Sequence, residues 1–283
     1  MTTECPACAR PTLQRPRFTV HGFAITRCTE CRLGRTVLAP DQDPLAPYDE
    51  AYFQGGHRDG YADYRGSAAV LRREFRSALE HLRREGCAGG RLLELGCAYG
   101  FFLDEAARNF RVHGVEVARA AAEAARARGH DVHCGVAEES FLAARGPFDA
   151  LVLLDVIEHL ERPADVLALL ARHAAPGAHL LVTTGDWNSL AARLMGRHWR
   201  LMTPPQHLWF FTPRTLTPVL ARAGFRVLSC EHPWKRVPLG LLAYQASRKL
   251  GLQALVQKLP LPDLGVPVNL FDAMRVVARW DPQ

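Results

Sequence analysis

Glu94 and Glu116 are two acids whose placement in the sequence suits ligand binding. Glu94 belongs to the apolar run 92–95, and a glycine-rich turn at 96–100 follows it at once. Such a turn brings bare backbone and a helix N-terminus up to a ligand, and a carboxylate beside it favours an ammonium group over a phosphate. Glu116 follows Gly96 by 20 residues, the spacing of an acid that accepts hydrogen bonds from both hydroxyls of a ribose. The two acids therefore predict a ligand with an amino acid at one end and a nucleoside at the other.

The competing interpretation of the turn is a dinucleotide site. That site requires the pattern Gly-x-Gly-x-x-Gly, because a pyrophosphate has to approach the backbone closely. The second and third glycine positions are occupied here by Ala98 and Phe101. The sequence therefore favours the nucleoside that carries an amino acid.

The elements that must position these acids alternate between strand and helix. Short apolar runs predict strands, and apolar residues at helical spacing between them predict helices. The expected strands are 92–95, 112–117, 131–134, 151–154, 179–183, 225–230 and 272–279, and the expected helices are 67–85, 101–109, 119–128, 164–173 and the segment from Thr212-Pro213 to Gly224. This alternation predicts an α/β fold, with a parallel sheet covered on both faces and a ligand at the carboxyl ends of its strands.

These motifs resemble those of the class I S-adenosylmethionine (SAM)-dependent methyltransferases. The first motif of that family is acid-x-Gly-x-Gly-x-Gly, matched by the run 94–100 with Ala98 at the middle glycine, and Asp149–Leu160 is similar to the motif of its fourth strand. The resemblance runs from about residue 48 to the C-terminus. It implies SAM as cofactor and a Rossmann-like sheet of seven strands, the last of them antiparallel. The residues expected to bind SAM are Tyr61, Glu94, Gly96, Cys97, Gly100, Glu116, Ala137 and Asp155.

Two histidines are candidates for taking a proton from a methyl acceptor, because the pKa of histidine lies near neutral pH. His207 follows an aromatic-rich insertion, and its segment resembles the Glu-His-x-x-Tyr-Phe-Ser stretch of the sugar C-methyltransferases, where the histidine is the base; Gln206 stands here at the glutamate. His159 ends the run Asp155-x-x-Glu158-His159, which resembles a triad proposed to hold a divalent metal in the ubiquinone-pathway O-methyltransferases. We expect His207 to act as general base and His159 to place the substrate. The alternative for Glu158 and His159 is a purely structural role at a helix entry.

Four of the eight cysteines form two Cys-x-x-Cys pairs, Cys5-Pro-Ala-Cys8 and Cys28-Thr-Glu-Cys31, with 19 residues between them. Two such pairs supply four thiolates for a tetrahedral zinc ion, and a site closed by four thiolates is structural because no position is left for water. The alternative is a redox pair, which normally consists of a single Cys-x-x-Cys opening a helix. The segment 18–26 alternates like a hairpin, so residues 1–38 are expected to form a small zinc ribbon.

The chain is expected to divide into three parts. The zinc lobe spans 1–38, a linker and tyrosine-rich lid spans 39–66, and the SAM-binding domain spans 67–283. The alternative role for the tyrosines is to pack the linker on the main domain. Two insertions, at about 186–212 and 233–267, are expected on the substrate side, the second as a cap or the surface of a homodimer.

Composition narrows the classes of partner. The chain has 283 residues and a net charge of +6, and its arginines are scattered among acids without a basic run, so a nucleic-acid partner is not expected. We also expect no membrane span and no signal peptide, since no apolar stretch approaches about 20 residues and the N-terminus is polar. The remaining cysteines suit a reducing cytoplasm.

The function expected from these observations is methyl transfer from SAM to a small-molecule acceptor: a natural-product intermediate, a sugar or a nucleotide sugar. Two alternatives remain. One is an RNA base methyltransferase that uses its zinc lobe to bind RNA, and the other is a non-catalytic subunit that binds SAM and serves regulation or assembly.

Overall fold

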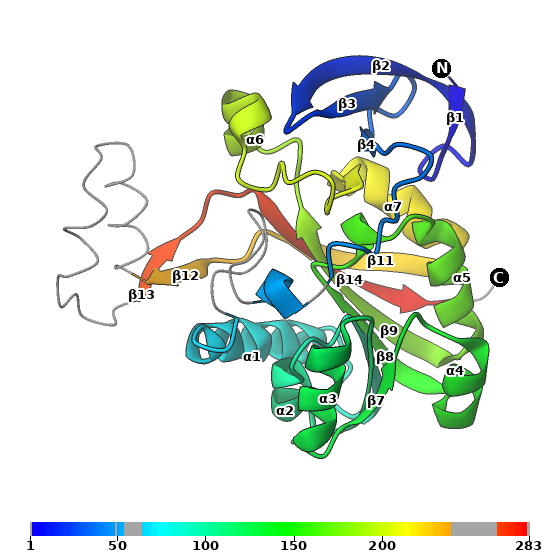
Figure 1. Ribbon diagram of the computed structural model, residues 1–283. Coiled ribbons are helices and arrows are strands. Elements are labelled where there is room, and N and C mark those ends of the chain that lie inside the picture. Colours follow the sequence, from blue (N-terminus) through cyan, green and yellow to red (C-terminus); the bar gives the residue numbers. More distant parts are fainter. Residues whose placement is uncertain (1, 49, 54–63, 239–264, 282–283) are drawn as a thin grey trace, which may run out of the picture.

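A twisted seven-stranded sheet forms the centre of the computed structural model, which describes residues 2–48, 50–53, 64–238 and 265–281 (Figure 1). Along the sheet the strands follow the order β11-β14-β9-β8-β5-β6-β7. Their bounds are β5 Gly90–Leu95, β6 Phe110–Glu116, β7 Asp131–Cys134, β8 Phe148–Leu154, β9 Ala174–Gly185, β11 Phe225–Glu231 and β14 Ala273–Trp280. Only β14 runs antiparallel to its two neighbours. The predicted Rossmann-like fold with seven strands is confirmed.

The central strands are apolar throughout because both faces of the sheet are covered. Leu92 and Leu93 are adjacent in β5, yet they belong to separate buried clusters on opposite faces. The cluster of Leu92 includes helices α1 (Ala68–Arg84), α2 (Phe101–Ala106) and α3 (Arg119–Ala127), and that of Leu93 includes α4 (Glu139–Arg145), α5 (Pro163–Arg172) and α7 (Pro213–Arg222). Figure 1 shows the two groups of helices on either side of the sheet. The alternation of side chains along a strand therefore builds a three-layer domain.

The N-terminal lobe is an antiparallel sheet in the order β1-β2-β3-β4-β10. Its strands are β1 Thr2–Cys5, β2 Arg10–Val20, β3 Phe23–Cys28, β4 Gly34–Val37 and β10 Trp209–Phe210. The predicted hairpin is longer than expected and turns at His21-Gly22, both of which have positive φ, as tight hairpin turns require. The fifth strand of this sheet comes from the first insertion of the main domain, more than 170 residues after β4.

The two insertions differ in how they are built. The first contains α6 (Leu190–Met195) and a short turn of helix, η3 (Gly196–His198), before it reaches β10. It ends at Thr212, whose side chain caps α7 ahead of Pro213, as the sequence predicted. At the ends of the second insertion, β12 (Lys235–Pro238) pairs with β13 (Gly265–Val268), whereas most of the expected cap or dimer surface lies outside the described residues.

Three local features differ from the sequence-based expectation. Helix α2 is shorter than the expected 101–109, because the chain turns at 107–109 into β6. Strand β9 extends on both sides of the expected 179–183, since it pairs with β8 and β14 over most of its length. Helix α4 was not expected, because seven residues are too short to show a helical period.

Candidate active site

The turn after β5 is built from residues in the left-handed region of backbone space. Gly96 has φ +76°, Ala98 φ +45° and Gly100 φ +77°. A Cβ on Gly96 would lie 2.6 Å from Cγ2 of Val156, so a side chain would clash there as well as strain the backbone. The turn is therefore closed and leaves its surface to backbone groups and small side chains.

Glu116 anchors this turn. Its carboxylate accepts a hydrogen bond at 2.7 Å from the amide of Ala98 and another at 2.8 Å from the amide of Ala118. Burial raises the pKa of Glu116, and these two amide donors oppose the rise. Each carboxylate oxygen keeps a second lone pair, so Glu116 can hold the turn and still accept from a ligand hydroxyl.

Glu94 is the more perturbed of the two acids. It is buried, and one of its oxygens has no hydrogen-bond donor among the described residues. Burial, with a smaller contribution from Glu116, raises the pKa of Glu94 well above its ordinary value. A buried carboxylate that lacks a donor is ready for a cationic group, which would supply both the missing hydrogen bonds and the compensating charge.

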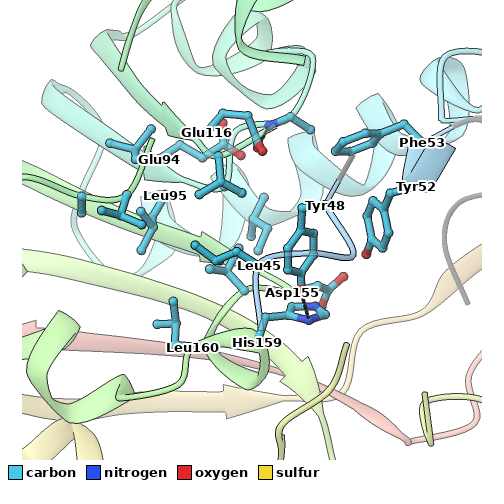
Figure 2. Close-up of a pocket in the computed structure, with 18 of the residues that line it drawn as sticks. Leu45, Tyr48, Tyr52, Phe53, Glu94, Leu95, Glu116, Asp155, His159 and Leu160 are labelled. Carbon is cyan, nitrogen blue, oxygen red and sulfur yellow. Dashed lines mark hydrogen bonds between the residues drawn. The ribbon is translucent and has the colours of Figure 1, made fainter. Parts of the chain in front are cut away.

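A cavity of about 390 Å³ opens above the turn, a volume within the range of cofactor sites. Glu94, Glu116 and Asp155 come from the ends of the parallel strands, and most of its aromatic wall comes from the segment before α1. Figure 2 shows Glu94 and Glu116 on one side and Asp155 with His159 on the other, with the rings of Tyr48 and Tyr52 between them. The lining also includes Leu45, Phe53, Tyr64, Glu74, Phe75, Gly96, Ala98, Ala137, Leu160 and Val166.

Not every residue predicted to bind SAM reaches this cavity. Glu94, Gly96, Glu116, Ala137 and Asp155 line it. Cys97 and Gly100 are not among the lining residues that the structure describes. Cys97 instead packs beneath the turn, where a Cβ on Gly114 would lie 2.7 Å from its sulfur, and the amide of Gly100 donates to the carbonyl of Cys97. Tyr61 lies outside the described residues.

Asp155 sits in a strained conformation at the end of β8, with φ +54°. Thr183 on the neighbouring strand holds it there: the Thr183 hydroxyl donates to the carboxylate at 2.9 Å, and the carbonyl of Thr183 accepts from the Asp155 amide at 3.1 Å. Strain of this kind persists where surrounding contacts determine the geometry, and it is common at functional sites. Here it turns the Asp155 carboxylate toward the cavity.

His159 closes the short helical turn η2 (Ile157–His159) and lines the cavity. Its Nδ1 lies 2.8 Å from the carbonyl oxygen of Gln206 and 2.6 Å from the hydroxyl of Tyr48. Because a carbonyl oxygen can only accept, the contact with Gln206 requires the proton on Nδ1; the Tyr48 hydroxyl oxygen then accepts from the same N–H, and Nε2 keeps the lone pair. Burial lowers the pKa of His159, so the ring is neutral at neutral pH.

His207, the base expected from the sequence, lies behind His159 and is not among the described lining residues. The two rings meet edge to face with centroids 4.7 Å apart, and Nδ1 of His207 donates to the carbonyl of Leu201 at 2.8 Å. Burial, aided by the nearby His159, lowers the pKa of His207 to about 3. The two candidate histidines thus lie in contact with each other, and His159 is the one that lines the cavity.

Glu158, His159 and His207 each offer one ligand atom, and the three atoms lie within 4.8 Å of one another. Nδ1–H of both rings is held by a backbone carbonyl, which is how metal-binding histidines are usually oriented. This group is compatible with a cation of the kind that the resemblance to the ubiquinone-pathway enzymes implied.

The four cysteines of the N-terminal lobe also converge. Their sulfurs lie within 4.8 Å of one another, with 3.5 Å between Cys5 and Cys31 and 3.8 Å between Cys8 and Cys28. Tetrahedral zinc with bonds of about 2.3 Å places its sulfurs about 3.8 Å apart, so the arrangement fits such an ion. The hydrogen bond between Cys5 and Cys31 lowers the pKa of Cys5 to about 5 and raises that of Cys31, so the two sulfurs share one proton in place of a metal.

Several cavity residues escaped sequence reasoning, among them Leu45, Phe53 and Glu74. Glu74 lies next to Phe75 on α1, and Leu160 follows His159 after η2. The only signal for Glu74 was an acid beside the apolar stripe of an amphipathic helix, a position that is ordinarily solvent-exposed. Leu160 was visible only as the last residue of the motif Asp149–Leu160.

A seven-stranded sheet with one antiparallel strand, and a cavity between two acids at its carboxyl edge, define a class I SAM-dependent methyltransferase. A family model described as a methyltransferase domain matches residues 67–230, more than half of the chain. The chain belongs to this family and is a SAM-dependent methyltransferase. Among the described residues, no helix combines the length and apolar character needed to cross a membrane.

Curated relatives include two proteins named ubiquinone biosynthesis O-methyltransferase. That of Alkalilimnicola ehrlichii is 30% identical over 144 residues, which cover 46% of this chain and 58% of the relative. That of Hahella chejuensis is 31% identical over 163 residues, which cover 52% and 67% respectively. The chain thus spans about three-fifths of the length of these relatives.

Two solved structures share the fold. The magnesium protoporphyrin IX methyltransferase of Synechocystis, solved with bound S-adenosylhomocysteine, superposes with a TM-score of 0.53 at 12% identity and covers 84% of this chain and 100% of its own. A SAM-dependent methyltransferase of Thermotoga maritima gives a TM-score of 0.50 at 18% identity, covering 77% and 94%. At these identities the likeness shows the fold alone.

Proposed function

We propose that this protein methylates a small molecule, with His159 as general base. The observation that carries the proposal is the single cavity that joins the acids at Glu94 and Glu116 to Asp155 and His159. One end has the carboxylates that suit SAM, and the other has a neutral histidine for an acceptor. The relatives named for ubiquinone biosynthesis and the neighbour named for magnesium protoporphyrin IX also have small-molecule substrates.

SAM supplies an activated methyl group on a sulfonium. In this proposal Glu94 binds its ammonium, Glu116 accepts from its ribose hydroxyls, and the loop with Ala137 contacts its adenine. Asp155 lies between the cofactor and the acceptor. The part of the linker with Tyr48 and Tyr52 excludes water above them.

His159 suits proton removal better than His207 for three reasons. It lines the cavity, its tautomer leaves Nε2 able to accept, and its lowered pKa keeps the ring neutral. His207 then lies behind His159 and orients the ring of His159 by edge-to-face contact. A positioned base contributes about 10²–10⁴-fold in rate.

The lining favours an acceptor without phosphate. None of the described residues around the cavity is Lys or Arg, although the chain carries 35 of these residues. Phosphate-bearing substrates are generally bound by cationic side chains or helix N-termini. A natural-product intermediate or a simple sugar therefore fits better than a nucleotide sugar, and better than RNA.

The N-terminal lobe is proposed to hold one structural zinc ion through Cys5, Cys8, Cys28 and Cys31. Boundaries at about residues 38 and 66 would then separate it and the aromatic linker from the SAM-binding domain. A divalent cation at Glu158, His159 and His207 is the second candidate role for those groups, favoured by their convergence.

Single-turnover assays of His159→Ala and His207→Ala, run with isotopically methyl-labelled SAM and an extract fraction that accepts methyl groups, distinguish these roles. The base proposal expects the larger loss in His159→Ala, with SAM affinity nearly unchanged and partial recovery at high pH. Equal and small losses would contradict it. If activity of the wild type vanishes with a chelator that spares the cysteine site and returns with Mg²⁺, the cation role is supported instead.

A further inference from the structure

The N-terminal lobe is hydrogen-bonded to the segment that leads into β10. Strand β4 pairs antiparallel with β10, with Gly34 opposite Phe210 and Arg35 opposite Trp209. Thr36 extends this joint: its amide donates to the carbonyl of Leu208 at 2.9 Å, and its hydroxyl donates to the carbonyl of His207 at 2.6 Å. Figure 1 shows the lobe resting on the main domain beside α7.

The other edge of the same segment holds the turn that carries His159. The amide of Leu208 donates to the carbonyl of Glu158 at 2.8 Å, and the indole of Trp209 donates to the carbonyl of Leu160 at 2.8 Å. His159, which lies between Glu158 and Leu160 in the chain, donates from Nδ1 to the carbonyl of Gln206. Residues 206–209 therefore form a bridge, with the lobe on one side and the cavity histidine on the other.

The bridge and strand β4 are also closely packed. Thr36 is 1% exposed, and a Cβ on Gly34 would lie only 2.0 Å from the ring of Trp187. Leu208 and Trp209 belong to the same buried cluster as Cys5, Cys28 and Leu33. Cys5 and Cys28 of the four-cysteine group thus share one continuous, close-packed core with the bridge.

The cysteine site fixes the start of β4. The amide of Cys28 donates to the carbonyl of Leu33, and the amide of Arg32 donates back to the carbonyl of Cys28. Gly34, the first residue of β4, follows directly. A metal at the four sulfurs would close this turn and set where β4 begins.

We propose that the lobe is a positioning element for His159, acting through Thr36 and the 206–209 bridge. By holding the carbonyl of Gln206 in place, the lobe keeps the proton of His159 on Nδ1 and the lone pair on Nε2. This inference rests on the proposed role of His159 as base. It assigns the lobe a part in catalysis beyond the stability of the fold, although the lobe does not line the cavity.

The test compares Thr36→Val with a matched control, Thr19→Val, which removes an exposed hydroxyl elsewhere in the lobe. The protein is labelled with ¹⁵N-histidine, and the signal of His159 is assigned by its loss in His159→Asn. In the wild type and in Thr19→Val, the ¹⁵N shifts should report the Nδ1–H tautomer. Thr36→Val should show a mixture of tautomers and a kcat lower by roughly two- to tenfold, the value of one hydrogen bond, with unchanged SAM affinity.

Removal of zinc from the full-length protein is the second perturbation, and it should move the same signal further. A His159 signal that stays in the Nδ1–H form in both Thr36→Val and the zinc-free protein would overturn the proposal. Should the zinc-free protein unfold, Thr36→Val alone decides. The two hypotheses fail separately: wild-type rates in His159→Ala would refute the base, whereas the tautomer reports only whether the lobe holds the ring.

Discussion

Glu116→Gln is the sharpest perturbation of the proposed cofactor site. The glutamate is 5% exposed, and its two oxygens accept from the amides of Ala98 and Ala118. The amide side chain has one oxygen and one NH₂ group, so one backbone N–H would face another donor. An unsatisfied buried donor costs about 1–3 kcal/mol, and the free energy of unfolding without SAM should fall by that amount.

The loss of SAM affinity is a separate effect. Glu116 is proposed to accept from two ribose hydroxyls, and hydrogen bonds to a charged acceptor contribute about 1.5–3 kcal/mol. Glutamine keeps one accepting oxygen and loses the charge, so about one such bond is lost. The dissociation constant for SAM should therefore rise by about 10- to 150-fold.

Isothermal titration calorimetry measures the affinity, and urea denaturation without ligand measures the stability. The matched control is Glu123→Gln, an exposed acid on α3 that does not line the cavity. It should change neither quantity. The reasoning would be refuted by a Glu116→Gln protein that loses stability as expected and yet binds SAM like the wild type, because Glu116 would then serve the turn alone.

Four further outcomes follow from the same contacts. At pH values below the pKa of Glu94, which burial raises well above its ordinary value, SAM binding should release a proton and tighten with rising pH, because an ammonium favours the ionised carboxylate; calorimetry showing no proton release there would count against it. On the acid side, the midpoint of the pH dependence of kcat should lie below about pH 6.5, because burial lowers the pKa of His159; a midpoint above that value would contradict the role of His159 as base. Chelation of zinc should lower the melting temperature, and elemental analysis without zinc removes the premise. Gly34→Ala should destabilise the protein by about 1–3 kcal/mol in urea through its clash with Trp187, and wild-type stability would disprove the tight joint.

Local sequence patterns predicted most of the fold. The apolar run at Leu92 to Leu95 predicted β5 because a strand buried on both faces must be apolar throughout. The glycine-rich turn could also be predicted from the sequence, because glycine is the residue that adopts positive φ most readily, and Gly96 and Gly100 both have positive φ. Glu94 and Glu116 could be placed beside the turn because each lies at the carboxyl end of a predicted strand.

The contacts between distant segments could not be predicted from the sequence. Strand β10 has two residues, too few to show any period, and its partner β4 lies more than 170 residues earlier in the chain. The depth of His159 relative to His207 depends on that joint, so sequence spacing could not decide which ring faces the cavity. The aromatic residues before α1 were visible as a cluster, but only the fold shows that Tyr48 meets His159.

In the proposed function, the cavity between Glu94 and His159 is where methyl groups are transferred from SAM to a small molecule. The most direct test incubates the full-length protein with host extract and SAM carrying an isotopically labelled methyl group, then separates small molecules, RNA and protein before mass spectrometry. The proposal predicts label in the small-molecule fraction, abolished by Glu116→Ala and strongly reduced by His159→Ala. Label that accumulates in RNA, or that His159→Ala leaves undiminished, would contradict it.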